Sequence, residues 1–282
     1  MTATWRCGPF SLPLDRTLVM GILNATPDSF SDAGMFADPA IALDHGRSLA
    51  DEGADIIDIG GESTRPGSQE LDPGEELARV RPLVAQLAEE LDIPISIDTR
   101  HADVAAAAVA AGAAIMNDVS GFRDHAMREV AAGCDAGCVV MHMLGEPKTM
   151  QENPRYEDVV AEVGAYLVGQ ARELENAGVA RDRIAIDPGL GFGKTVDHNL
   201  EILRRLPELT VLGYPVLIGA SRKRFIGTIL GIETAIERLE GSLAVASWSA
   251  EHGAAVVRVH DVRETVRALR MTEAIARGRA AR

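Results

Sequence analysis

The chain has 282 residues, of which 46% are hydrophobic and 25% are charged, so it can enclose one large core. A formal net charge of −14 without a basic stripe argues against a nucleic-acid partner. It also means that a few local cations must hold any anionic substrate, because the overall field repels it. No apolar run approaches the ~20 residues that cross a bilayer, and residues 1–9 do not resemble a signal peptide. We therefore expect a cytoplasmic protein without a membrane partner.

Short apolar segments alternate with amphipathic segments along the whole chain. The expected strands are Val19–Leu23, Asp55–Ile59, Ile93–Ile97, Ala114–Asn117, Gly137–Met141, Arg183–Asp187, Val216–Gly219 and Ala255–Val259. The expected helices are Pro39–Glu52, Pro73–Leu91, Ala102–Ala110, Ala126–Ala132, Tyr156–Ala177, His198–Leu206, Arg224–Leu230, Ala235–His252 and Val262–Ala276. Several of the helices end at a glycine, which suits a left-handed cap.

Eight strand–helix units predict an α/β fold, a (β/α)8 or TIM barrel, in a single domain of residues 1–282. Residues 1–17 are expected to form a short N-terminal hairpin below the barrel. The alternative is an open doubly wound sheet, which should carry a glycine-rich turn after its first strand. The first strand instead runs into Asn24–Asp28, which favours the barrel.

Cysteine and histidine lack the spacing of a zinc site. Cys7, Cys134 and Cys138 are an odd number of cysteines in a long chain, so we expect buried, reduced thiols. The chain has no HxxxH, HExxH or paired CxxC spacing. A zinc centre is therefore not expected.

Four polar residues follow four different apolar segments. Asp98, Asn117, Asp187 and Lys223 each stand where a predicted strand ends. Taken singly, each has a structural explanation, such as a helix cap for Asp98 or a surface position for Lys223. In a closed barrel, however, the carboxyl ends of the strands meet at one face. We therefore predict a pocket that contains carboxylates, an amide and an ammonium group.

Anion-binding residues belong to the same predicted face. Arg258 and His260 alternate along the last strand, so they point to one side, and an arginine can bind phosphate or stack on a ring. Asn24 ends the first strand, which neighbours the last strand in a closed barrel, and its amide oxygen could ligate Mg²⁺. The segment Gly189–Lys194 lacks the spacing of a phosphate loop, so we expect a flexible barrel loop there.

Two connections are longer than is usual between a strand and the next helix. They are residues 24–37, after the first strand, and residues 60–72, after the second. Long loops on the carboxyl face of a barrel commonly act as lids or contact the substrate.

Five segments together resemble the dihydropteroate synthase family of the folate pathway. They are Met20–Asp32, Gly60–Gly67, Asp187–Lys194, Gly219–Lys223 and Arg258–Asp261. One such segment would be weak evidence, whereas five in the right order on the right strands are specific. The resemblance implies that 6-hydroxymethyl-7,8-dihydropterin pyrophosphate and 4-aminobenzoate condense to 7,8-dihydropteroate and pyrophosphate, with Mg²⁺ as cofactor.

The resemblance also implies roles for individual positions. The implied catalytic residues are Asp98, Asp187, Lys223 and Arg258. The implied pterin site comprises Asp98, Asn117, Met141, Asp187, Phe192, Lys223 and Arg258. The implied pyrophosphate site comprises Asn24, Thr64, Arg65, Arg258 and His260, with Asn24 as the metal ligand. The implied aminobenzoate site comprises Phe30, Arg65, Pro66, Ser221 and Arg224, and its loop includes Ser31 and Asp32. A homodimer and inhibition by sulfonamides, which mimic aminobenzoate, are further implications.

The expected chemical step is dissociative. The bond between the pterin carbon and pyrophosphate breaks first, and Asp98 and Asp187 stabilise the cation that forms. The aniline nitrogen of aminobenzoate then attacks, while its carboxylate lies at the helix start near Arg224.

Two other interpretations stay open. One is a pterin-dependent methyltransferase barrel, which works with a corrinoid partner and needs no pyrophosphate site. The other is a pterin-binding paralogue that has lost activity. The first is disfavoured by Asn24, Arg258, His260 and the segment Ser221–Lys223. The second is disfavoured by the presence of Asp32, Thr64 and Arg65.

Overall fold

The computed structural model describes residues 3–25, 39–62, 71–145 and 149–279. Eight parallel strands form a sheet in the order β8-β7-β6-β5-β4-β3-β10-β9. They are β3 (Leu18–Asn24), β4 (Ile56–Gly60), β5 (Ile95–Asp98), β6 (Ile115–Asp118), β7 (Gly137–Met141), β8 (Ile184–Asp187), β9 (Leu217–Ile218) and β10 (Val256–Val259). A parallel bridge between Ile186 and Val216 joins β8 to the residue before β9 and closes the ring. The predicted barrel is confirmed, and the open sheet is wrong.

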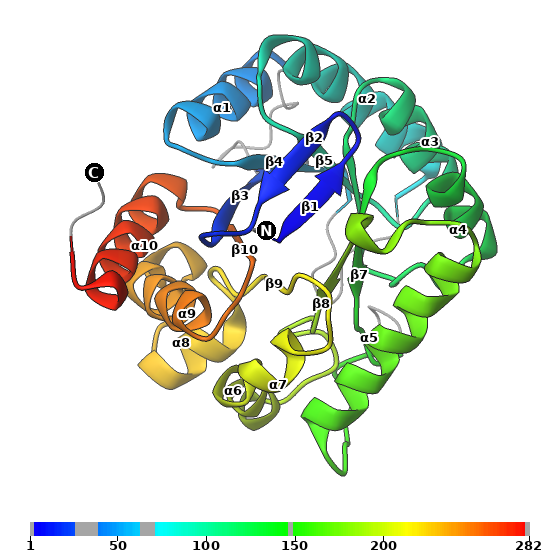
Figure 1. Ribbon diagram of the computed structural model, residues 1–282. Coiled ribbons are helices and arrows are strands. Elements are labelled where there is room, and N and C mark those ends of the chain that lie inside the picture. Colours follow the sequence, from blue (N-terminus) through cyan, green and yellow to red (C-terminus); the bar gives the residue numbers. More distant parts are fainter. Residues whose placement is uncertain (1–2, 26–38, 63–70, 146–148, 280–282) are drawn as a thin grey trace.

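Helices surround the strands as an outer ring (Figure 1). They are α1 (Pro39–Asp51), α2 (Pro73–Glu90), α3 (Ala102–Ala110), α4 (His125–Ala132), α5 (Val159–Asn176), α6 (Val196–Arg204), α7 (Leu206–Thr210), α8 (Arg224–Leu230), α9 (Leu239–Glu251) and α10 (Val262–Arg277), with 3₁₀ turns η2 (Arg181–Arg183) and η3 (Ala235–Glu237). The helix predicted over His198–Leu206 corresponds to α6, which ends at Arg204. The short helix α7 that follows was not predicted, and Pro207 stands in its first turn, where a missing N–H group needs no partner.

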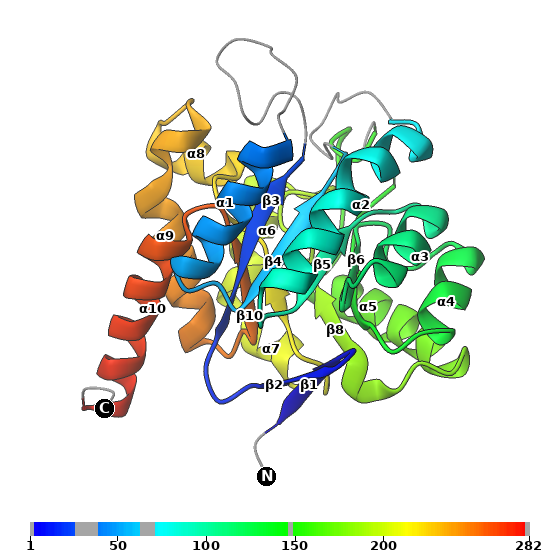
Figure 2. The same cartoon turned by 90° about the horizontal axis from the view of Figure 1, so that it is seen from above.

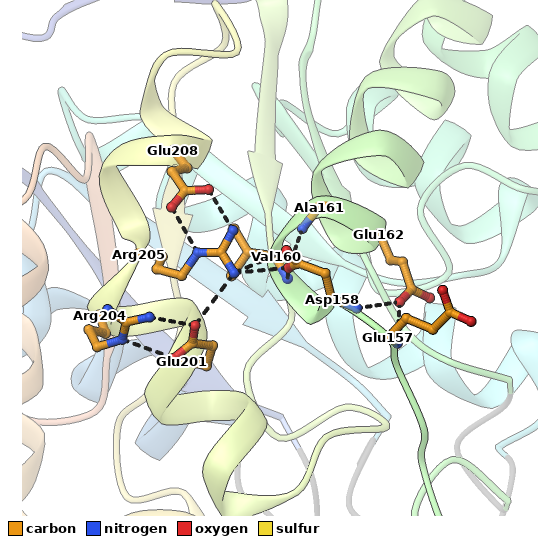
Figure 3. Close-up of polar contacts among 9 residues, drawn as sticks. All are labelled: Glu157, Asp158, Val160, Ala161, Glu162, Glu201, Arg204, Arg205 and Glu208. Atoms are coloured by element: carbon orange, nitrogen blue, oxygen red, sulfur yellow. Dashed lines mark hydrogen bonds and ion pairs between the residues drawn. The ribbon is translucent and has the colours of Figure 1, made fainter.

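Arg205 ties the start of α5 to α6 and α7 (Figure 3). Its Nη1 lies 3.0 Å from Oδ1 of Asp158, and its Nη2 lies 2.7 Å from Oε2 of Glu208. Asp158 is the N-cap residue of α5 and accepts hydrogen bonds from two backbone N–H groups of the first turn. Because this side chain satisfies the open amides, α5 begins at Val159 and not at Tyr156 as predicted.

An antiparallel hairpin of β1 (Thr4–Cys7) and β2 (Phe10–Pro13) lies across the N-terminal end of the barrel (Figure 2). Trp5 is fully buried there, and its Nε1 donates to the carbonyl oxygen of Arg183 at 2.9 Å. It packs in one cluster with residues of the barrel strands, among them Leu18, Met20, Ile56, Ile115, Val139, Ala185, Leu217 and Val256. The predicted hairpin is confirmed, and it covers the end of the barrel opposite to the carboxyl ends of the strands.

The positions inside the barrel change from apolar to polar along the strands. The apolar cluster under the hairpin includes Ile56, Ile115, Ala185 and Val256. Two residues later, the same four strands carry Asp58, Asn117, Asp187 and Arg258. Residues two apart in a strand point to the same side, so both layers line the interior. The polar layer therefore lies at the carboxyl ends of the strands.

Two further predictions concern the whole chain. No helix in the described ranges is long and apolar enough to cross a membrane. Cys7, Cys134 and Cys138 are free thiols, and Cys7 and Cys138 are buried, as predicted.

Candidate active site

Arg258 lies between two carboxylates at the mouth of the barrel. Its Nε lies 2.5 Å from Oδ2 of Asp58, and its Nη2 lies 2.6 Å from Oδ2 of Asp98. The three residues come from β10, β4 and β5, and Arg258 is 200 positions from Asp58 in the sequence. Hydrogen bonds between charged groups are the stronger kind in proteins. Two such contacts fix the plane of the guanidinium group.

Asp58 is a member of this site that the sequence analysis did not single out. Its side chain is fully buried, and its Oδ2 also accepts a hydrogen bond from Nδ2 of Asn117 at 3.2 Å. Its Oδ1 is buried without a hydrogen-bond partner in the described part of the chain. The sequence did hold a signal, because Asp58 interrupts the apolar strand Ile56–Gly60, and a buried carboxylate needs partners.

Asp187 borders the same space as Arg258. A Cβ atom at Gly219 would lie 3.8 Å from the Cβ of Arg258 and 3.8 Å from Oδ2 of Asp187, so glycine leaves the gap between them open. Oδ1 of Asp187 accepts a hydrogen bond from the N–H of Gly189 at 2.7 Å. Gly189 has a φ of 65°, and a Cβ there would lie 2.0 Å from the carbonyl oxygen of His142. This close approach requires glycine and fixes the turn that orients Asp187.

Lys223 and Phe192 lie together beside Asp187. The ammonium group of Lys223 donates to the carbonyl oxygen of Leu190 and lies 4.6 Å from the centre of the Phe192 ring. Phe192 packs against an apolar cluster of Val119, Met141, Met143 and Met150. The structure thus brings together Met141 and Phe192, which were assigned to the pterin site by resemblance alone.

Burial changes the protonation of Asp98. Desolvation raises the pKa of Asp98 to about 7, in part opposed by Arg258 and assisted by Asp58, Glu76 and Asp118. Groups with a pKa near neutrality are common at catalytic sites, although structural ion pairs show them as well.

Asp187 and Lys223 are buried, and the charge of each counteracts the effect of burial on the pKa of the other. Desolvation raises the pKa of Asp187, and Lys223 counteracts it. Desolvation lowers the pKa of Lys223 to about 8, and Asp187 counteracts it. Burial also lowers the pKa of Arg258, but Asp58 and Asp98 outweigh that effect and raise it, so the guanidinium group stays charged.

Side chains from several elements hold the loop that follows β8. The carbonyl oxygens of Leu190, Gly191, Phe192 and Gly193 accept hydrogen bonds from the side chains of Lys223, Gln151, Lys194 and Tyr156, respectively. Lys194 is only 3% exposed. The structure therefore differs from the predicted flexible loop, because three of the four side-chain donors, Lys223, Gln151 and Tyr156, come from other parts of the chain and could not be anticipated from the glycine-rich segment itself.

Ser221 and His260 contact each other at the mouth of the barrel, where anion binding was predicted. Oγ of Ser221 lies 3.0 Å from Nδ1 of His260 and accepts from its backbone N–H at 3.2 Å. Arg224 is the first residue of α8 and is exposed.

Asn24 is half-buried at the end of β3, where it pairs with Gly60 of β4. Within the described ranges, no group of three or more His, Cys, Asp or Glu side chains could hold a metal ion. A single amide oxygen fits Mg²⁺ in the mode in which substrate phosphates and water complete the coordination.

Six predicted site residues lie outside the described ranges and have no structural account here. They are Phe30, Ser31, Asp32, Thr64, Arg65 and Pro66. Glu62 and Leu71 flank residues 63–70 and are joined to each other, because the N–H of Leu71 donates to Oε1 of Glu62 at 3.2 Å. Glu62 also pairs with Arg100, just after β5, at 3.1 Å. Glu62 therefore links Leu71 to the segment that follows β5.

The chain is similar to known proteins over nearly its whole length. Residues 20–260 match a family model described as pterin binding enzyme. The chain is 48% identical over 277 residues to a dihydropteroate synthase of Neisseria meningitidis serogroup B, which covers 96% of this chain and 97% of the relative. It is similar to the solved structure of Xanthomonas albilineans dihydropteroate synthase with 4-aminobenzoic acid, with a TM-score of 0.92, 45% identity and coverage of 98% and 99%. It is also similar to Burkholderia cenocepacia dihydropteroate synthase complexed with 7,8-dihydropteroate, with a TM-score of 0.89, 44% identity and 98% coverage of both chains.

Proposed function

The chain belongs to the dihydropteroate synthase family of pterin-binding enzymes, which are transferases of folate biosynthesis, and we propose how its barrel mouth carries out the family's reaction. In that reaction, 6-hydroxymethyl-7,8-dihydropterin pyrophosphate and 4-aminobenzoate form 7,8-dihydropteroate and pyrophosphate. The observation that supports the proposal most is that Asp98, Asn117, Asp187, Lys223 and Arg258 meet at one end of the barrel.

The polar layer of the barrel binds the pterin. Carboxylates accept hydrogen bonds from ring N–H groups, and the amide of Asn117 can both donate and accept, which suits a ring of alternating donors and acceptors. Lys223 supplies a donor, and Phe192 and Met141 supply the apolar contact. Arg258, with its plane fixed by two carboxylates, offers a flat face on which the ring stacks.

The bond that breaks joins the exocyclic carbon of the pterin to an oxygen of the pyrophosphate, and both electrons leave with that oxygen. Arg258 and His260 hold the departing anion. Asp98 and Asp187 face the resonance-stabilised cation that remains, and a preorganised charge of this kind contributes roughly 3 kcal/mol per well-placed group. Asn24 is the residue that would hold Mg²⁺, which would neutralise part of the negative charge on the leaving group.

The second substrate forms a carbon–nitrogen bond to this cation, and its aniline nitrogen then loses a proton. Ser221 and Arg224 hold 4-aminobenzoate, together with Phe30, Arg65 and Pro66. The Xanthomonas albilineans relative, which shares this fold, was solved with 4-aminobenzoic acid, and the Burkholderia cenocepacia relative with 7,8-dihydropteroate. These two ligands are a substrate and the product of the proposed reaction.

The proposal is tested by measuring pyrophosphate release from the purified protein. Release should require the pterin pyrophosphate, 4-aminobenzoate and Mg²⁺ together, and should match the formation of dihydropteroate. A protein that binds the pterin but releases no pyrophosphate would be the inactive paralogue. Methyl transfer to a corrinoid without pyrophosphate release would identify a methyltransferase barrel.

Three implications of the family remain predictions. They are inhibition by sulfonamides in competition with 4-aminobenzoate, a homodimer, and a cytoplasmic location. A tight-binding sulfonamide that leaves pyrophosphate release unchanged would contradict the first, and a monomeric mass by light scattering would contradict the second.

A further inference from the structure

Asp58 is the most deeply placed carboxylate among the described residues of the barrel mouth that contact Arg258. Its side chain is fully buried, whereas those of Asp98 and Arg258 are partly exposed. One of its oxygens serves two donors, Arg258 and Asn117, on two different strands. The donors belong to residues to which the proposed reaction assigns pterin contacts, so Asp58 lies behind both of them.

The contacts of Asp58 also decide how the charge of Arg258 is shared. Arg258 bridges Asp58 and Asp98, so the three residues together carry one more negative than positive charge when both carboxylates are ionised. Without Asp58, the same guanidinium group would pair with Asp98 alone and neutralise it. The side chain of Asp58 is fully buried, and its Oδ1 has no hydrogen-bond partner in the described ranges. Little solvent therefore screens the charge of Asp58.

We propose that Asp58 is a positioning residue of this site: it orients Arg258 and Asn117 and shares the charge of the arginine, so that a net negative charge faces the substrate when Asp98 is ionised. The inference rests on the proposed function, since it assumes that a cation forms next to Asp98. In this proposal Asp58 acts through Arg258 and Asn117 and not on the pterin itself, because its side chain is fully buried.

The test is the substitution Asp58→Asn, which keeps the shape of the side chain and removes its charge. We expect kcat to fall about 10- to 100-fold, in line with the loss of one well-placed charge, and the KM for 4-aminobenzoate to stay within about twofold. If Asp58 had a purely structural role, the substitution would lower stability without a selective fall in kcat at a nearly constant KM for 4-aminobenzoate.

The pH profile of kcat provides a second readout. Asp98 must be ionised, so activity is lost as the pH falls through the pKa of that group. The charged groups that act on Asp98 include Arg258 and Lys223 as cations and Asp58, Glu76 and Asp118 as carboxylates, and Asp58 raises this pKa. Removing the Asp58 charge while the others remain should therefore move the acid limb to lower pH, by about one unit. An unmoved limb with an unchanged kcat would overturn the proposal.

Asp55→Asn is the matched control. It removes the same charge three residues earlier. Asp55 pairs with Arg16 at 2.5 Å, and this pair does not belong to the mouth. It should leave kcat and the acid limb unchanged. If Asp58→Asn melts below the assay temperature, the same curves are measured at a lower temperature, at which the variant is folded. Absence of pyrophosphate release by the wild type would overturn the proposed function, whereas an active wild type with an unaffected Asp58→Asn would overturn only the role of Asp58.

Discussion

The Nζ of Lys194 lies 2.9 Å from Nδ1 of His142 and 3.0 Å from the carbonyl oxygen of Phe192. Burial and, to a lesser degree, the neighbouring Lys194 lower the pKa of His142 to about 3, so the imidazole is neutral near pH 7 and its Nδ1 can accept a hydrogen bond. Tyr166 packs edge-on against the same ring, 4.9 Å between centroids. Lys194 therefore joins the loop that carries Phe192 to the end of β7, and this places Phe192 next to Lys223.

Lys194→Met should raise the KM for the pterin pyrophosphate about tenfold and destabilise the protein by roughly 1–3 kcal/mol, because two buried acceptors lose their donor. Steady-state kinetics and urea denaturation provide the measurements. Tyr156→Phe is the control, since it removes one hydrogen bond to the same loop without affecting His142. An unchanged KM in Lys194→Met would show that the loop does not depend on this pair.

Lys194 also predicts a pH dependence of stability. Desolvation lowers the pKa of Lys194 to about 7, from its ordinary value of 10.5. Between these values the unfolded chain binds more protons than the folded chain, so the free energy of unfolding should rise with pH through this window. Urea denaturation at about pH 7 and about pH 9.5 should show a smaller rise in Lys194→Met than in the wild type. Part of the rise should remain, because the pKa of Lys223 is also lowered. Equal rises in both proteins would mean that Lys194 keeps an ordinary pKa.

Asp98→Asn should reduce turnover far more than it weakens pterin binding. The carboxylate acts mainly on the cation, and its loss corresponds to roughly 3 kcal/mol, or about a hundredfold in kcat. In the wild type, kcat should fall as the pH drops through about 7, where Asp98 becomes protonated. Calorimetric titration of the pterin pyrophosphate and rapid-mix kinetics separate the two effects. Equal losses in affinity and turnover would argue against a charge role.

Arg258→Ala should raise the KM for the pterin pyrophosphate and also destabilise the fold. It leaves Asp58 and Asp98 buried without their cation, and breaking a buried ion pair commonly costs about 3–5 kcal/mol. Arg205→Ala is a comparison variant, because Arg205 also bridges carboxylates but does so at the surface between helices (Figure 3). Its loss of stability should be much smaller, and its kinetics should match the wild type. A Michaelis constant unaffected by Arg258→Ala would contradict the assigned contacts.

Trp5→Ala should lower the melting temperature without changing either Michaelis constant. Trp5 is buried among the inner residues at the N-terminal end of the barrel, and truncation of a buried tryptophan costs about 3–5 kcal/mol. Phe10→Ala, in the same hairpin but only partly buried, should cost less. A changed KM would mean that the hairpin transmits strain to the opposite end.

Much of the fold and part of the site could be predicted from local pattern. The predicted strands end within one or two residues of the observed ones, because alternation and turn residues depend on neighbours in the chain. Strand ends then placed Asp98, Asn117, Asp187 and Arg258 at one mouth, since parallel strands of a closed barrel share a direction. Helix boundaries were less accurate where a cap or a proline decided them, as at Asp158 and Pro207.

The pairing of charges needed the folded chain. Asp58 appears in the sequence as one acidic residue in an apolar segment, and its partner Arg258 stands 200 positions away. Lys194 is a similar case, because its acceptor His142 follows a different strand, β7. Alternation and chain direction follow from covalent geometry and can be inferred one segment at a time. Which two charges lie within 3 Å of each other, and how strongly burial shifts their protonation, depends on the distances and the solvent exclusion that arise only when all eight strands close around them.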